Sequence, residues 1–290
     1  MGLTQNADIN EIAFDLYRYQ LLPINKNIQF SLDNNVLSFD DLVSKKNDLL
    51  ADILKNKNIF LNHKHSKTLF RLEANTNDIF VFRLGVQRSL KRNTREFKIE
   101  EIENYPNILL IINNDKSSQK IAIQTNYKAF NNTKIPARIL QRSLTNFLRQ
   151  LNLSIYVEPI YRTSDFWQII DNYPNKIKAI TFDLIRPNLS NISDSIDKKL
   201  KELQTNIDAH KSKLEFESNR ESNLKISHDN LQISGLVNYG SQGGGQISVK
   251  VEGIKKKIKT NKSTEIITIS AAEITGDGKA IADFFKNLLG

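Results

Sequence analysis

Six basic side chains and one acidic side chain fall within the segment FRLGVQRSLKRNTREFK, residues 82–98. Guanidinium groups form paired hydrogen bonds with phosphate oxygens, and neutralising several phosphates releases bound counterions. The preceding DIFVF indicates a buried strand that ends at Gly85, so a loop would present these cations. A solvated loop that pairs with the acids at 100–103 is the alternative interpretation. We expect phosphate contact from Arg83, Arg88, Lys91, Arg92 and Arg95.

Two other basic groups support the same interpretation. Residues 135–152, IPARILQRSLTNFLRQLN, have the spacing of an amphipathic helix, and Arg138, Arg142 and Arg149 share its polar side. The segment GIKKKIKTNK, residues 253–262, lies between two alternating segments and is typical of a hairpin tip. Its lysines are also typical of edge strands that resist aggregation. All five lysines of the segment could contact a nucleic-acid backbone, Lys259 and Lys262 included, and we expect this contact from Lys255, Lys256 and Lys257.

A metal-dependent nuclease is the enzymatic alternative. Such a site needs a carboxylate followed by an acid–x–Lys triplet on a neighbouring strand, because the acids hold Mg²⁺ and the lysine stabilises developing charge. Asp78 with Glu96 and Lys98 matches this pattern loosely. The pair His63 and His65 has the spacing of zinc ligands but lacks a third ligand nearby. We therefore assign no catalytic residue, no metal and no cofactor from the sequence.

The glycine triplet in GSQGGGQIS, residues 240–248, is compatible with close approach of backbone amides to a phosphate. A P-loop would continue with Lys and then Ser or Thr, whereas Gln246 and Ile247 follow here. We therefore expect a mobile loop in this segment.

The composition narrows the class of protein. The chain has 290 residues, 39% hydrophobic content, a net charge of +9 and a pI near 9.4, which favours acidic partners such as nucleic acid. It contains no cysteine, which excludes disulfides and thiol catalysis. No apolar run approaches the roughly 20 residues of a membrane span. We expect a cytoplasmic protein.

The order of the expected elements is mixed, with hairpins and helices but no steady alternation of strand and helix. This order predicts an α+β fold of mainly antiparallel hairpins packed with amphipathic helices. A break near 160–176 suggests domains at 1–160 and 177–290, although one continuous domain is also compatible. Residues 193–214 repeat apolar side chains at nearly heptad spacing, which predicts a long helix for dimerisation, partner binding or core packing.

Several phrases together resemble uncharacterised proteins of bacterial anti-phage defence loci. They lie within residues 80–190 and comprise FRLGVQRSLKRNTREFK, ENYPNILLIINN, IAIQTNYKAF, FWQII and ITFDLIRPNL. The resemblance implies a prokaryotic cytoplasmic protein that acts with a partner encoded beside it, and it transfers no catalytic residue.

The sequence therefore predicts a basic, non-enzymatic nucleic-acid-binding subunit, either a sensor or an adaptor, of an anti-phage defence system. A protein-interaction module, acting as a homo-oligomer or within a multi-protein complex, is the second hypothesis. A magnesium-dependent nuclease is the third.

Overall fold

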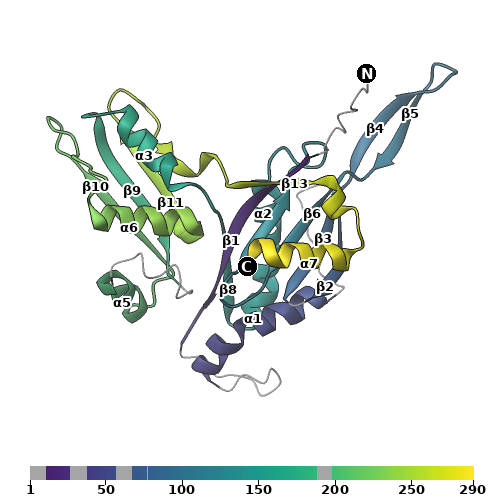
Figure 1. Ribbon diagram of the computed structural model, residues 1–290, viewed down its shortest axis with the longest axis horizontal. Coiled ribbons are helices and arrows are strands. Elements are labelled where there is room, and N and C mark those ends of the chain that lie inside the picture. The colour runs from purple at the N-terminus through teal and green to yellow at the C-terminus, as the bar shows by residue number, and fades with distance from the viewer. Residues whose placement is uncertain (1–10, 27–37, 57–66, 77, 188–197) are drawn as a thin grey trace, which may run out of the picture.

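The computed structural model describes residues 11–26, 38–56, 67–76, 78–187 and 198–290. Their elements form two lobes, each built on its own sheet, and a long hairpin arm that projects from the larger lobe (Figure 1). All strand pairings in these residues are antiparallel, and helices cover the sheets. The expected α+β fold class is confirmed.

The larger lobe contains a seven-stranded sheet in the order β13-β1-β7-β6-β3-β2, with β8 also paired to β1. Its strands are β1 (Glu11–Pro23), β2 (Thr68–Thr76), β3 (Ile79–Val86), β6 (Asn107–Asn113), β7 (Lys120–Gln124), β8 (Leu153–Pro159) and β13 (Ile266–Ser270). The central strands are apolar on both sides because both faces of this sheet are covered.

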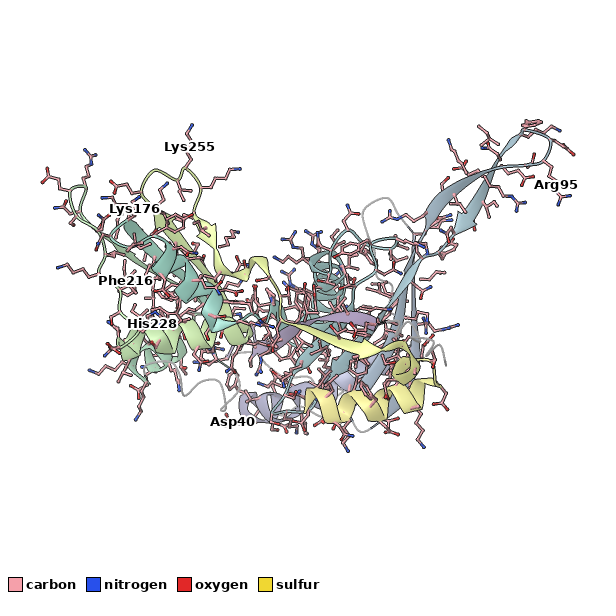
Figure 2. All side chains as sticks on the ribbon, turned by 45° about the horizontal axis from the view of Figure 1, so that its top comes forward. Asp40, Arg95, Lys176, Phe216, His228 and Lys255 are labelled. Atoms are coloured by element: carbon pink, nitrogen blue, oxygen red, sulfur yellow. The ribbon has the colours of Figure 1, made fainter. Side chains whose placement is uncertain are left out.

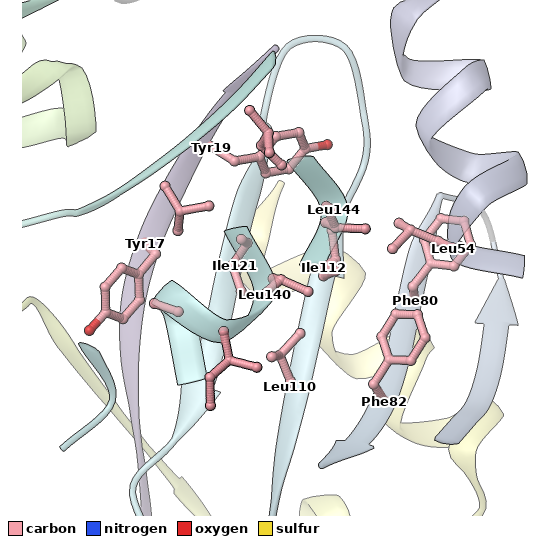
Figure 3. Packing of buried hydrophobic residues seen from close by; sticks show 14 of the residues in the cluster. Tyr17, Tyr19, Leu54, Phe80, Phe82, Leu110, Ile112, Ile121, Leu140 and Leu144 are labelled. Atoms are coloured by element: carbon pink, nitrogen blue, oxygen red, sulfur yellow. The ribbon is translucent and has the colours of Figure 1, made fainter. Parts of the chain in front are cut away.

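Helices α1 (Phe39–Lys55) and α2 (Lys134–Gln150) cover one face, and α7 (Gly278–Leu289) covers the other. Alternate residues of β1 serve the two cores. Tyr17 and Tyr19 pack with Leu140 and other α2 residues (Figure 3), whereas Phe14 packs edge-on against Phe285 of α7. Because successive side chains of a strand point to opposite faces, this alternation fixes the face to which each β1 side chain points.

Local signals explain where these helices begin. The Ser38 side chain accepts a hydrogen bond from the backbone N–H of Asp41 and caps α1. Asp277 does the same for α7 through the N–H of Ala280. Pro136 lies in the first turn of α2, where its missing N–H is not needed.

The smaller lobe contains a four-stranded sheet in the order β10-β9-β11-β12. Its core joins this sheet to α3 and α6, through Phe166, Phe182, Val237 and Ile247 among others. The elements of this lobe are α3 (Thr163–Asn172), β9 (Ile177–Ile185), α5 (Lys198–Asn206), β10 (Lys211–Glu217), α6 (Leu231–Tyr239), β11 (Gly245–Val251) and β12 (Ile258–Lys259).

The long helix expected over 193–214 is not formed. Within the described part of this range, α5 ends at Asn206 and the chain continues as β10, where Leu214 pairs with Phe182 of β9. Asp208 has a φ of 58°, which breaks the helix between them. Pairing with β9 overrides the apolar spacing, so this segment offers no heptad face.

The glycine-rich segment is a buried turn, not the mobile loop that its composition indicates. Residues Gly240–Gly244 form a π-helical turn, η2, wedged between β1, β8 and β9. Gly243 has a φ of 83°, and a Cβ there would collide with Arg18. Gly245 has a φ of 150°, and a Cβ there would collide with the carbonyl of Asp183. The glycines therefore allow the two lobes to meet closely.

The last elements of the chain return to the larger lobe. A second short turn, η3 (Thr260–Lys262), leads from β12 to β13, which pairs with β1, while α7 packs against β2 and β3. The chain passes from the first sheet to the second between β8 and β9. The last strand and helix nevertheless belong to the larger lobe. β13 is a strand of its sheet, and the apolar face of α7 covers the face of that sheet that α1 and α2 leave open.

Candidate nucleic-acid interface

The basic segment at 82–98 forms part of a hairpin arm, not a loop. β4 (Arg88–Asn93) and β5 (Ile99–Asn104) pair in a two-stranded sheet that projects from the larger lobe (Figure 1). Arg95 lies near its far end (Figure 2). The cations are thus carried along the arm, and those near its tip are far from the body of the protein.

The arm is nearly neutral. Residues 88–104 contain five basic and four acidic side chains, which leaves a net charge of +1. Arg92 pairs with Glu100 at 2.9 Å, and Lys98 pairs with Glu96 at 3.1 Å. Among the described residues, Lys91 and Arg95 have no side-chain partner in this arm. The expected pairing with downstream acids therefore holds for part of the segment.

Two of the expected phosphate contacts have roles in the fold. Arg83 donates from Nε and Nη2 to the carboxylate of Glu73 and from Nη1 to Asn107 at 3.0 Å. Arg88 donates from Nη2 to the carbonyl of Ala129 at 2.8 Å. These contacts attach β3 and the base of the arm to their neighbours. Both residues are half-buried and are corrected to structural positions.

The nuclease triad is not assembled. Asp78 precedes β3, whereas Glu96 and Lys98 lie at the tip of the arm, which begins beyond the other end of β3. The eight residues of β3 alone span about 27 Å at about 3.4 Å per residue. In the described ranges, no three His, Asp or Glu side chains lie together as metal ligands. His63 and His65 are outside the described residues.

Helix α2 presents its arginines to solvent. Leu140, Leu144 and Leu148 are buried against the sheet, and this packing turns Arg138, Arg142 and Arg149 outward as expected. Arg138 and Arg142 are one turn apart, but Arg149 is about 16 Å further along the axis from Arg138 at about 1.5 Å per residue. The first two can therefore act together on neighbouring phosphates.

A hollow of about 270 Å³ lies where the two lobes face each other, and we call it the valley. Its walls carry three cations from distant parts of the sequence, which are Lys134 and Arg138 of α2 and Lys259 of β12. The remaining polar wall includes Gln141, Glu158, Gln246 and Asn261. Lys259 belongs to the basic 253–262 segment that the sequence indicates for backbone contact, whereas Lys134 was not expected from the sequence to bind.

The electrostatics of the valley favour an anion. Burial, and then the positive charges of Arg138 and Lys259, lower the pKa of Lys134. The Lys134 ammonium donates to the carbonyl of Asn261 at 2.8 Å, which fixes its position. Burial raises the pKa of Glu158, whose carboxylate accepts a hydrogen bond from Gln246 at 3.4 Å. The mutual repulsion of the cations would be relieved by a bound phosphate.

The lysines at the β11–β12 tip divide into two kinds. Lys255 and Lys256 are exposed, and Lys255 stands at the upper edge of the smaller lobe (Figure 2). Lys257 donates to Glu215 and to Thr181, and its hydrogen bond lowers the pKa of Glu215 to about 2. Lys257 is therefore tied to the sheet, whereas the other two are available to a ligand.

Comparison of the chain with protein-family models, curated proteins and solved structures finds no match. Among the described helices, none combines the length and apolar character needed to span a bilayer.

Proposed function

We propose that the protein binds nucleic acid through its phosphate backbone, with the valley as the central contact. The observation that carries this proposal is the convergence of Lys134, Arg138 and Lys259 on one hollow. The three cations outnumber the one carboxylate of the valley wall, Glu158, and an excess of cations gathered from separate elements is typical of surfaces that neutralise phosphates. Arg142 continues the same face of α2.

A polymer fits the distribution of the remaining free cations better than a small anion does. Lys255 and Arg95 lie at opposite ends of the molecule but on the same side in Figure 2. No small molecule reaches both, whereas a strand of nucleic acid that crosses the valley can approach each end. Lys256, Lys91 and Arg95 would then add contacts that are weak and independent of base sequence.

The test is a fluorescence-anisotropy titration with single- and double-stranded DNA and RNA of matched length. Binding at about 50 mM salt that weakens steeply by about 200 mM, with little sequence preference, is the expected result. Mg²⁺ is included and the nucleic acid is examined afterwards on a denaturing gel. The proposal is for binding without cleavage, so intact nucleic acid is the expected result. Absence of binding to all four ligands at both salt concentrations would overturn the proposal.

The resemblance to proteins of anti-phage defence loci extends this proposal to a biological setting. The protein would be a sensing or adaptor subunit of such a system, with a protein partner that supplies the enzymatic step. Phage plating on cells that express the locus, with the valley cations intact or substituted, tests this extension. Equal protection by both forms of the locus would contradict it.

Protein interaction through the arm is the second candidate function. Leu90, Phe97 and Ile99 are 51%, 95% and 70% exposed on the arm, where the charges nearly balance. Exposed apolar side chains amid mixed charges are typical of protein contacts and not of phosphate contacts. Measurement of the solution mass, alone and after Phe97→Ser with Ile99→Ser, tests self-association. A monomer at all concentrations would exclude that form of the hypothesis.

A further inference from the structure

Arg18 is a buried cation without a matching acid. It lies in the middle of β1, and its side chain is only 5% exposed. Its Nε and Nη1 atoms are inaccessible to solvent and have no hydrogen-bond partner among the residues that the structure describes. A buried, unpaired guanidinium costs several kcal/mol. Such a group either binds a ligand or strongly destabilises the folded state.

The surroundings of Arg18 add positive charge. Its register partner on β7 is Lys120, which lies on the same face of the sheet because opposed residues of paired strands share a face. Burial, and then the charge of Arg18, lower the pKa of Lys120, whereas the carboxylate of Glu265 acts in the opposite direction. The Lys120 ammonium also donates to the carbonyl of Gly290 at 3.3 Å. Glu158 is the register partner on β8, but its carboxylate bonds to Gln246 and makes no ion pair with Arg18 among the described residues.

The site is enclosed by the junction of the two lobes. The turn at Gly243 covers Arg18, and Gln20 donates from Nε2 to the Gly243 carbonyl at 3.3 Å. The Tyr239 hydroxyl of α6 donates to Oε1 of Gln20 on β1 at 3.4 Å, which links the smaller lobe to β1. The covering turn excludes a polymer, so the site would admit only a small group.

We propose that Arg18, assisted by Lys120, binds a small oxyanion, either a phosphate or a carboxylate group, at the junction of the lobes. Nε and Nη1 point to different sides of the guanidinium, so the anion would accept a charge-assisted hydrogen bond from one of these two unoccupied donors. Lys120 supplies the second positive charge from the neighbouring strand. A bound anion would stabilise the contact between the lobes, because Arg18 lies beneath the turn that joins them.

This site adjoins the valley, because Glu158 lines the valley and lies opposite Arg18 on β8, but the cations of the two sites are different. Tyr17 and Tyr19 of β1 pack in the core beneath α2, whereas Arg18 follows the alternate positions, which include Leu16 in the core beneath α7. None of the valley cations contacts Arg18 in the described structure. The two proposals can therefore fail separately.

Thermal unfolding of the full chain, with inorganic phosphate, acetate or chloride at matched ionic strength, tests the inference. At about ten times its dissociation constant, a specific anion should raise the midpoint by roughly 3 °C and the rise should saturate. Phosphate and acetate serve as separate arms to distinguish the two oxyanions. The variants are Arg18→Met, which removes the charge and keeps the volume, Lys120→Met, and the valley pair Lys134→Gln with Arg138→Gln.

The inference predicts a saturable rise for wild type and for the valley pair, no rise for Arg18→Met, and several-fold weaker anion affinity for Lys120→Met. Arg18→Met in chloride should unfold at or above the wild-type temperature, because an unpaired buried charge is gone. Should Arg18→Met not fold, unchanged anion affinity in Lys120→Met would overturn the inference. An equal rise in wild type and Arg18→Met, or no rise with either oxyanion, overturns it directly. A rise lost only in the valley pair places the anion in the valley, which rejects this site and supports the proposed function.

Discussion

Removal of the three valley cations should lower the salt dependence of nucleic-acid binding by a definable amount. The change is Lys134→Gln, Arg138→Gln and Lys259→Gln in one variant. The affected side chains line the hollow between the lobes and lie outside the hydrophobic clusters, so the variant should keep its fold.

The magnitude follows from counterion release. Each duplex phosphate that a cation neutralises contributes about 0.9 to the slope of log affinity against log salt, and each single-strand phosphate about 0.7. Between about 50 and about 200 mM salt, one duplex contact therefore changes the affinity about 3.5-fold. When three contacts are lost, the ratio of the affinity at about 50 mM salt to the affinity at about 200 mM salt should be about 40-fold smaller than in wild type for a duplex. For a single strand this ratio should be about 20-fold smaller.

The assay is anisotropy over at least four salt concentrations, and the matched control removes three exposed lysines elsewhere. Lys55→Gln, Lys279→Gln and Lys286→Gln give the same net charge but lie at the end of α1 and on α7, away from the valley. The control should keep nearly the whole wild-type slope. Equal slopes for both variants would refute the reasoning, because binding would then depend on net charge and not on the valley.

Three further predictions concern the fold around the site. Gly243→Ala should lower the free energy of unfolding by about 2–4 kcal/mol in urea denaturation, because it combines a strained φ with a collision against Arg18. The matched Gly253→Ala also has a positive φ but meets nothing within 4 Å, so a cost of only about 1 kcal/mol is expected, and equal costs would contradict the close approach at Gly243. Burial, and then Arg186, lower the pKa of Lys46 to about 8, so the folded state binds fewer protons than the unfolded state between about pH 8 and the ordinary value of 10.5. The contribution of Lys46 to the free energy of unfolding therefore rises with pH across that window. At pH 7, Lys46→Met should be more stable than wild type by on the order of 3 kcal/mol, and this difference in stability should shrink by pH 9.5. A difference that stays constant with pH would show that the charge of Lys46 is not responsible. Replacement of residues 90–102 by Asn-Gly should shorten the arm to a tight hairpin and leave the midpoint of thermal unfolding within about 2 °C of wild type, because none of these side chains belongs to a core cluster; a larger loss would mean that the arm supports the body.

Several helices and strands of the larger lobe can be predicted from the sequence, because each has its own apolar pattern or capping residue. In β1, in α2 and in the hairpins β2–β3 and β6–β7, the apolar pattern of the sequence matches the burial of the side chains. The closing helix follows the capping residue Asp277. In these segments local preference and tertiary packing agree, so the pattern alone identifies the element.

Elements whose identity depends on a distant partner could not be obtained in this way. Leu214 fits a helical repeat, but pairing with β9 makes it part of a strand. The glycine triplet has the composition of a loop, but the approach of β1 from more than 200 residues away makes it a buried turn. The arm was interpreted as a loop because short exposed strands that are rich in charge lack an alternating apolar pattern.

The candidate site shows the same limit. Arg138 and Arg142 were found because helical spacing places them on one exposed side. Lys134 is a single lysine in a lysine-rich chain, and only the fold brings it together with Lys259 of the basic 253–262 segment. Conversely, the basic run at 82–98 contains Arg83 and Arg88, which the fold uses for its own hydrogen bonds. Local charge density therefore overestimates binding where acids lie on the partner strand.

Cross-linking of bound nucleic acid to the protein, followed by mass spectrometry of the peptides, tests the central claim most directly. The valley proposal predicts cross-links within residues 134–142 of α2 and 255–261 around β12, with the arm tip contributing only with longer ligands. Cross-links confined to residues 88–104 of the arm, or spread over α7, would contradict it.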